Sequence, residues 1–195
     1  MAPVVSRATH EVRIIGGQWK RSKLQVLDKP GLRPTPDRVR ETLFNWLGQD
    51  LRGWRCIDVF AGTGALGFEA ASRGALHVTM VEQDRALAAA LEATRTRLQA
   101  EAVQVTHGDG VAALRRLAAQ SMDLVFLDPP FESALLETAL RAAAPVLRPG
   151  GWLYLEAGQA WTADNLAGYG LALRRHLKAG AVHAHLLQRP VLPNA

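Results

Sequence analysis

From Trp54 onward the sequence alternates short apolar runs with helical segments, and this alternation constrains the fold more than any other feature. Strands that are apolar throughout and separated by helices are typical of a parallel sheet covered on both faces. The apolar runs span residues 56–60, 78–81, 103–106, 124–127 and 152–155, and the helical segments lie near 65–73, 85–99, 110–120 and 133–147. Residues 171–177 and 181–188 have no helix between them and predict a hairpin. We therefore expect an α/β fold whose mostly parallel seven-stranded sheet ends in an antiparallel hairpin.

The first 55 residues have a different pattern and a different charge. Alternation around glycines over residues 12–27 predicts a β-hairpin, and Thr35 is expected to cap a helix that begins at Pro36 and ends near Leu47. Residues 1–55 hold 11 Lys and Arg against 5 Asp and Glu, whereas residues 56–195 hold 12 against 13. This asymmetry indicates either a polyanionic partner or a solvated basic face. We expect an N-terminal extension over 1–53 and a main domain over 54–195.

The composition excludes several classes of protein. Cys56 is the one cysteine, so an intramolecular disulfide and a cysteine-rich zinc site are both excluded, and a reducing cytoplasmic setting is favoured. Residues 1–11 lack the apolar segment of a signal peptide, and no apolar stretch approaches ~18 residues. His183 and His185 share a strand face but have no evident third ligand, so we interpret them as exposed strand residues. We expect a cytoplasmic, metal-free monomer.

A glycine loop follows the first apolar run of the main domain. Residues 62–67 fit G-x-G-x-x-G, and they lie between a predicted strand and a predicted helix, which is the context this motif requires. Glu82 follows Gly62 by 20 residues, at the end of the next strand, where a carboxylate can accept hydrogen bonds from ribose hydroxyls. The alternative is a tight turn with a surface glutamate. The combination favours a nucleoside-containing cofactor.

Asp58 decides which cofactor the loop favours. A carboxylate just before the loop would repel a pyrophosphate but suits the cationic amino-acid end of S-adenosylmethionine (SAM). Asp109 can accept from an adenine amino group, or it can cap the helix that follows. The expected cofactor-binding residues are Asp58, Ala61, Gly62, Gly64, Glu82, Gln83, Asp109 and Gly110.

A second motif, Asp128-Pro129-Pro130-Phe131, follows the strand predicted over 124–127. The prolines rigidify the segment and remove two backbone donors, so the Asp128 carboxylate and the Pro129 carbonyl remain as acceptors for an exocyclic amine. Phe131 offers a ring on which a base can stack. Alone, the motif would be interpreted as a proline-rich strand terminator. In open α/β sheets ligands bind beyond the carboxyl ends of the strands, so both motifs are expected at one site.

Both motifs together resemble the SAM-dependent methyltransferases that modify amines. The segment Arg33-Pro34-Thr35, followed by Arg38, Arg40-Glu41 and Phe44-Asn45, is similar to the RsmD family, and the resemblance covers about residues 12–188. It implies a Rossmann-like methyltransferase fold, SAM as cofactor, and methylation of guanine N2 in bacterial 16S ribosomal RNA, free or within the small subunit. The implied catalytic residues are Asp128, Pro129, Pro130 and Phe131. The expected RNA-binding residues are Arg13, Lys20, Arg21, Lys23, Arg33, Arg38 and Arg40.

Two other functions share parts of this pattern. The same site could methylate another exocyclic amine, such as adenine N6 in DNA. An NAD-dependent oxidoreductase is disfavoured by Asp58 and by the Asp-Pro-Pro-Phe motif.

Overall fold

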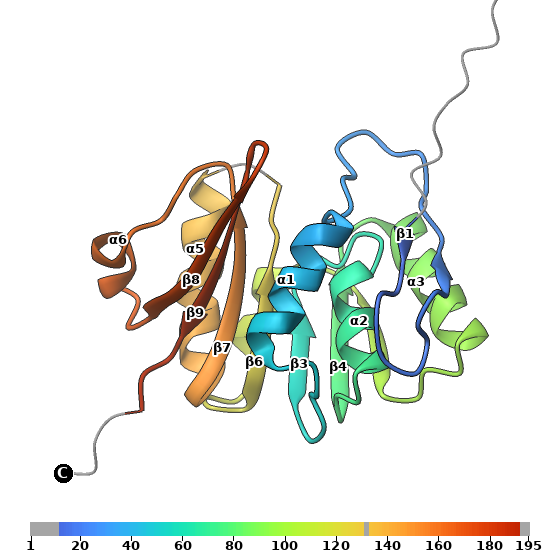
Figure 1. Ribbon diagram of the computed structural model, residues 1–195, viewed down its shortest axis with the longest axis horizontal. Helices are drawn as coiled ribbons and strands as arrows, with labels where there is room; N and C mark the ends of the chain where they lie inside the picture. Colours follow the sequence, from blue (N-terminus) through green and yellow to red (C-terminus); the bar gives the residue numbers. More distant parts are fainter. Residues whose placement is uncertain (1–11, 131–132, 192–195) are drawn as a thin grey trace, which may run out of the picture.

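The computed structural model describes residues 12–130 and 133–191, and it contains a two-stranded and a seven-stranded sheet (Figure 1). The strands of the larger sheet lie in the order β5-β4-β3-β6-β7-β9-β8. Neighbours from β5 to β7 are parallel, whereas β9 is antiparallel to both β7 and β8. The predicted sheet with its terminal hairpin is therefore confirmed. The strands are β1 (Val12–Arg13), β2 (Lys23–Leu24), β3 (Arg55–Asp58), β4 (His77–Glu82), β5 (Val103–His107), β6 (Met122–Leu127), β7 (Leu147–Ala157), β8 (Ala172–Ala179) and β9 (Val182–Gln188).

Helices cover both faces of the large sheet, as its apolar strands require. In Figure 1, α1 and α2 lie in front of the sheet and α5 behind it. Buried residues of α1, α2 and α3 pack with Cys56, Phe126 and Tyr154 on one face. Buried residues of α4, α5 and α6 pack on the other face, where Val125 and Leu155 lie. The helices are α1 (Asp37–Leu47), α2 (Ala65–Ser72), α3 (Arg85–Arg97), α4 (Gly110–Arg116), α5 (Ser133–Val146) and α6 (Ala163–Ala167).

The N-terminal hairpin is present but short, because β1 and β2 pair over only two residues each. The expected Thr35 cap is wrong: α1 begins at Asp37 after Pro36, and no side chain caps it. Thr35 is instead buried, and its hydroxyl hydrogen-bonds the carboxylate of Glu156 on β7. Phe44 of α1 lies 6.3 Å from Phe126 of β6, measured between ring centroids. The helix therefore belongs to the core of the main sheet, although the charge pattern separates residues 1–53 from the rest.

Within the described residues, no helix combines the length and the apolar character needed to cross a bilayer.

Candidate active site

The carboxyl ends of β3, β4, β6 and β7 bring four acidic side chains to one edge of the sheet. Asp58 ends β3, Glu82 ends β4, Asp128 follows β6, and Glu156 lies near the end of β7. The strand order reverses between β3 and β6, because β4 and β5 extend to one side and β7 to the other. Ligands of open α/β sheets bind at such a switch point. The two motifs predicted to act together therefore lie on adjacent strands.

The glycine loop turns between β3 and α2 with two residues in the left-handed region. Gly62 has φ +53° and Gly64 has φ +78°, a conformation that side chains with a Cβ disfavour. A Cβ on Gly64 would lie 2.6 Å from Leu91 of α3 and 2.7 Å from Phe68 of α2, so the loop is packed closely against both helices. Leu32, from the segment between β2 and α1, lies against Gly62 on the outer side. The loop is thus a tight, partly covered turn.

Glu82 holds this loop to the end of β4. One carboxylate oxygen accepts from the Gly62 amide at 2.8 Å, and the other accepts from the Asp84 amide at 2.8 Å. Asp84 caps α3 and pairs with Lys29 at 2.5 Å, which ties the segment before α1 to this corner. Each Glu82 oxygen keeps further acceptor capacity. The carboxylate can therefore order the loop and still accept from a ligand hydroxyl.

Asp58 is 1% exposed, and only one of its two carboxylate oxygens has a hydrogen-bond partner among the described residues. Its Oδ2 accepts from the Gly67 amide at 3.1 Å, whereas the buried Oδ1 has no hydrogen-bond partner among the described residues. Burial raises the pKa of Asp58 to about 7; backbone hydrogen bonds from Gly67 and Phe60 oppose this shift, and the charges of Glu82 and Glu156 add to it. A buried carboxylate in this condition suits a cationic or hydrogen-donating ligand.

The remaining predicted cofactor residues surround the same edge. Asp109 caps α4 by accepting from the Ala112 amide at 2.6 Å, which confirms the capping interpretation, and contact with an adenine stays a prediction. Gly110 is buried, and a Cβ there would lie 2.2 Å from the Val59 carbonyl oxygen. The Gln83 side chain is exposed next to Glu82, and Ala61 is buried beside Gly62.

Asp128 and the two prolines leave the end of β6 in an extended segment. Every residue of β6 is buried, Asp128 is half-buried, Pro129 is buried and Pro130 is exposed. Burial, followed by the charges of Glu156 and Asp58, raises the pKa of Asp128 well above its ordinary value. Phe131 lies outside the described residues.

Sequence reasoning missed Glu156 and its two hydroxyl partners. Glu156 is 4% exposed and accepts from the Tyr154 hydroxyl at 2.7 Å. Thr35 supplies a second hydrogen bond. Burial raises the pKa of Glu156, and both hydroxyls oppose that shift. The available signal was an acidic residue at the carboxyl end of a strand that is otherwise apolar.

The residues at this edge of the sheet fit SAM. The glycine loop offers backbone close to a ligand, Glu82 can accept from ribose hydroxyls, and the unpartnered Asp58 Oδ1 can accept from an ammonium group. No lysine or arginine of the described residues forms an ion pair with Asp58, Asp128 or Glu156, so the local charge favours a cation over a pyrophosphate.

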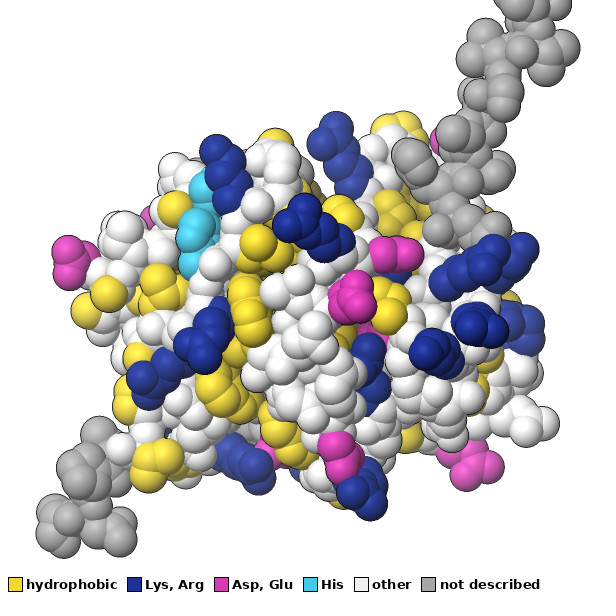
Figure 2. Space-filling model, in the orientation of Figure 1, with side chains coloured by type: hydrophobic (Ala, Val, Ile, Leu, Met, Phe, Trp, Pro, Cys, Tyr) yellow, Lys and Arg dark blue, Asp and Glu magenta, His cyan; other side chains and the backbone are white. Residues whose placement is uncertain are grey.

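Six of the seven predicted RNA-binding residues are exposed in the structure. Figure 2 shows a group of Lys and Arg side chains over the region where β1, β2 and α3 lie in Figure 1. Their contact with RNA stays a prediction. The exposed residues are Arg13, Lys20, Arg21, Lys23, Arg33 and Arg38.

The prediction that the seventh residue, Arg40, binds RNA is wrong, because the Arg40 side chain is fully buried. Its guanidinium donates to Glu69 at 3.2 Å, to the Arg13 carbonyl at 2.9 Å and to the Thr35 carbonyl at 3.2 Å, and it also pairs with Asp37. These bonds fasten α1 to the N-terminal hairpin and to α2. Arg40 therefore has a structural role.

The histidines also differ from expectation. His185 is fully buried, not exposed: its Nε2 accepts from the Trp161 amide at 3.0 Å, and burial lowers its pKa to about 4. The His176 ring stacks on His183 and His185, with centroids 5.1 and 4.7 Å away. Among residues 12–130 and 133–191, no group of three or more His, Cys, Asp or Glu has a metal-binding arrangement.

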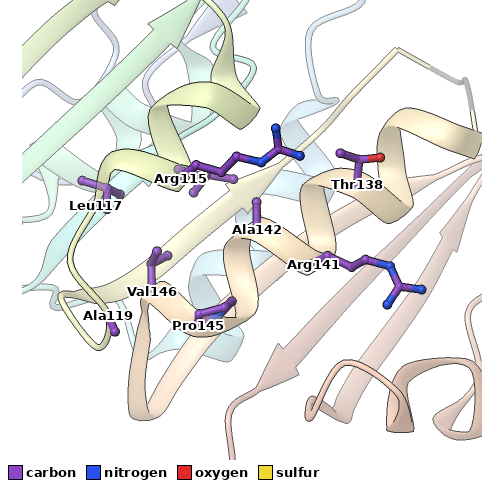
Figure 3. Close-up of a pocket in the computed structure, with 9 residues that line it drawn as sticks. Arg115, Leu117, Ala119, Thr138, Arg141, Ala142, Pro145 and Val146 are labelled. Atoms are coloured by element: carbon purple, nitrogen blue, oxygen red, sulfur yellow. The ribbon is translucent and has the colours of Figure 1, made fainter.

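A cavity of about 490 Å³ lies away from the carboxylates, between α4 and α5 (Figure 3). Arg115, Thr138, Arg141 and Pro145 are among its lining residues. It contains none of the residues of the two motifs, so it does not enter the candidate active site.

Comparisons with known proteins agree with this geometry. The model of the family described as conserved hypothetical protein 95 matches residues 12–188. Ribosomal RNA small subunit methyltransferase D of Escherichia coli strain K12 is 46% identical over 147 residues, which are 75% of this chain and 72% of that protein. The protein of the same name from Haemophilus influenzae is 44% identical over 154 residues, 76% of this chain and 80% of its own.

A solved structure of a putative methyltransferase from Escherichia coli, YhhF, has the same Rossmann-like arrangement. It superposes with a TM-score of 0.80 at 36% identity and covers 93% of this chain and 99% of that one. With a family model over most of the chain and relatives of such identity, the protein belongs to the RsmD family of methyltransferases.

Proposed function

We propose that this protein transfers a methyl group from SAM to the exocyclic N2 of a guanine in small-subunit ribosomal RNA. The observation that carries the proposal is the meeting of two motifs at the switch point of the sheet: an acidic glycine loop on β3 and β4, and Asp128-Pro129 after β6. The names of the relatives support ribosomal RNA of the small subunit as the substrate. Guanine N2 is supported by the resemblance and by an acceptor pair suited to an amino group.

In this proposal the chain's own residues mainly position the reactants. SAM supplies a methyl group already activated on a positively charged sulfur. The Asp128 carboxylate and the Pro129 carbonyl accept the two hydrogens of N2 and thereby align its lone pair with the methyl carbon. As the nitrogen–carbon bond forms and the carbon–sulfur bond breaks, Asp128 is the base placed to take the proton that N2 loses. The guanine must leave its stack to enter the site.

The decisive experiment compares modified nucleosides. Ribosomal RNA from cells that lack the protein should lose one N2-methylguanosine by mass spectrometry, and the wild-type gene should restore it while an Asp128→Ala gene should not. Loss of N6-methyladenosine from DNA instead, or of no methylated nucleoside, would contradict the proposal.

Glu82→Ala should weaken SAM binding. The variant removes an acceptor for ribose and the bond that holds the Gly62 amide. A charge-assisted hydrogen bond contributes roughly 1.5–3 kcal/mol, so we expect a Kd about 10- to 150-fold higher. Titration calorimetry measures the Kd, with Glu101→Ala, an exposed residue between α3 and β5, as the control. A Glu82→Ala Kd equal to that of the control would remove Glu82 from the cofactor site.

Neutralising the N-terminal basic group should weaken RNA binding and reduce its dependence on salt. The variant replaces Arg13, Lys20, Arg21 and Lys23 by glutamine. Each lost phosphate contact should lower the slope of log K against log salt by about 0.7–0.9. Filter binding of a small-subunit RNA fragment at several salt concentrations measures the slope. Replacing the exposed Arg115 and Arg116, at the far end of α4, is the control, and equal slopes in both variants would place the RNA surface elsewhere.

A further inference from the structure

Three carboxylates occupy neighbouring positions on one face of the sheet. Asp58 of β3 lies opposite Phe126 of β6, and Phe126 lies opposite Tyr154 of β7. Asp128 lies two residues after Phe126, and Glu156 lies two residues after Tyr154. The residues in between, Leu127 and Leu155, pair with each other. Because side chains alternate along a strand, Asp128 and Glu156 extend the face on which Phe126 and Tyr154 pack. The two carboxyl groups are therefore lateral neighbours at the carboxyl edge.

No positive side chain of the described residues neutralises this group. β9 places Ala184 opposite Glu156, and the segment before α1 contributes only the Thr35 hydroxyl. Arg40 reaches the Thr35 backbone, but its guanidinium is directed to Glu69 and Asp37. The titratable groups that face Glu156 are Asp58, Asp128 and Tyr154, with Glu82 beyond Asp58.

Neighbouring carboxylates at a partly buried edge resist simultaneous ionisation, because each charge raises the free energy of ionising the next. The Tyr154 and Thr35 hydroxyls stabilise the charged form of Glu156. Among the described residues, no donor forms a hydrogen bond with the Asp128 carboxylate, and the pKa of Asp128 is raised by burial and by the charge of Glu156. The Asp128 and Glu156 pair therefore binds a proton more readily than two separate, solvated carboxyl groups would.

We propose that Glu156 is a positioning residue that shares one proton with Asp128, and that the pair releases this proton when a cationic ligand binds at the edge. This inference rests on the proposed function, since SAM is the expected cation. A positive sulfur favours two ionised carboxylates, and Asp128 is then a full acceptor for N2. After methyl transfer the sulfur is neutral, so the carboxyl pair again favours binding a proton. The pair then takes up the proton that N2 loses. Glu156 thus couples the charge of the bound cofactor to the protonation state of Asp128.

The linkage has a definite sign. The carboxyl pair has a high proton affinity in the free protein and a lower one in the complex, so binding releases a proton and strengthens as pH rises. Between the two proton affinities, the Kd of SAM should fall by up to about tenfold per pH unit. S-adenosylhomocysteine lacks the sulfonium charge, and its Kd should depend on pH less steeply.

The test is calorimetry of both ligands with the full-length protein, in phosphate and in Tris buffer at the same pH. The difference in enthalpy between the buffers gives the number of protons released. We expect the wild type to release more protons with SAM than with S-adenosylhomocysteine. Glu156→Gln keeps an acceptor for Tyr154 but removes the charge that raises the proton affinity of Asp128, so this excess should decrease. Asp128→Asn should decrease the excess as well, whereas Glu137→Gln, exposed on α5, should retain it.

The outcomes separate this inference from the proposed function. Equal proton release for the two ligands in the wild type would overturn the inference and leave SAM binding intact. An excess that Glu156→Gln retains would overturn the role of Glu156, and Asp128→Asn would then show whether Asp128 alone carries the proton. Failure of both ligands to bind the wild type would overturn the proposed function and this inference with it. The wild-type comparison requires no variant, so a variant that fails to fold does not prevent the test.

Discussion

Asp128→Ala should slow methyl transfer at saturating SAM by about 10- to 150-fold. The variant removes one charge-assisted hydrogen bond to the amine, a loss of roughly 1.5–3 kcal/mol in the transition state. The rate should fall further if the proton from N2 also passes to this carboxylate. Single-turnover methylation of a small-subunit RNA fragment with saturating SAM measures the chemical step without product release.

Asp128→Asn divides the two contributions of this residue. The amide keeps one acceptor oxygen but cannot take a proton. If alignment is the main contribution, Asn should be intermediate between wild type and Ala. An Asn variant as slow as Ala would assign the main contribution to charge or proton acceptance, and an Ala variant with the wild-type rate would remove Asp128 from the mechanism.

Glu69→Ala should destabilise the fold by about 3–5 kcal/mol, because it removes the buried carboxylate that pairs with both Arg40 and Arg73. Glu69 is fully buried and accepts from Arg40 at 3.2 Å and from Arg73 at 2.8 and 3.1 Å. It also accepts from the amides of Ile15 and Gly16 at 2.9 and 2.8 Å. One side chain thus joins the N-terminal hairpin, α1 and α2. For a chain of this length the loss corresponds to a Tm lower by roughly 6–20 °C, measured by calorimetric or circular dichroism melting.

The control for Glu69 is an ion pair of similar geometry at the surface. Glu92 and Arg95 lie three residues apart on α3, with side chains 47% and 36% exposed. Solvent screens such a pair, so Glu92→Ala should cost less than about 1 kcal/mol. A Glu69→Ala variant no less stable than Glu92→Ala would show that the buried network does not hold the N-terminal hairpin in place.

Local pattern was sufficient for the order of the elements and for both motifs. Strands such as β6 are apolar on both faces, and glycine and aspartate mark the turns, so each element could be recognised from a few neighbouring residues. The ends of the elements were predicted less well. Helix α1 begins at Asp37, one residue later than expected, because Thr35 hydrogen-bonds Glu156 on β7 instead of capping the helix. The short helix α6 was not predicted at all.

The sequence by itself determined the alternation of strands and helices, the acidic glycine loop and the Asp128-Pro129 segment, because each depends on residues that are close together in the chain. Only the tertiary structure decided which charged residues are buried and what they face. Arg40 lies in a basic segment, and nothing near it in the chain indicates that its side chain is buried and pairs with Glu69, 29 residues away. Glu156 likewise reads as a strand-end acid until the parallel pairing of β6 and β7 brings it beside Asp128. Whether a charged side chain contacts solvent, an opposite charge or another carboxylate depends on packing between residues that are far apart in the chain. A local sequence pattern does not show which of these distant residues will be its neighbours.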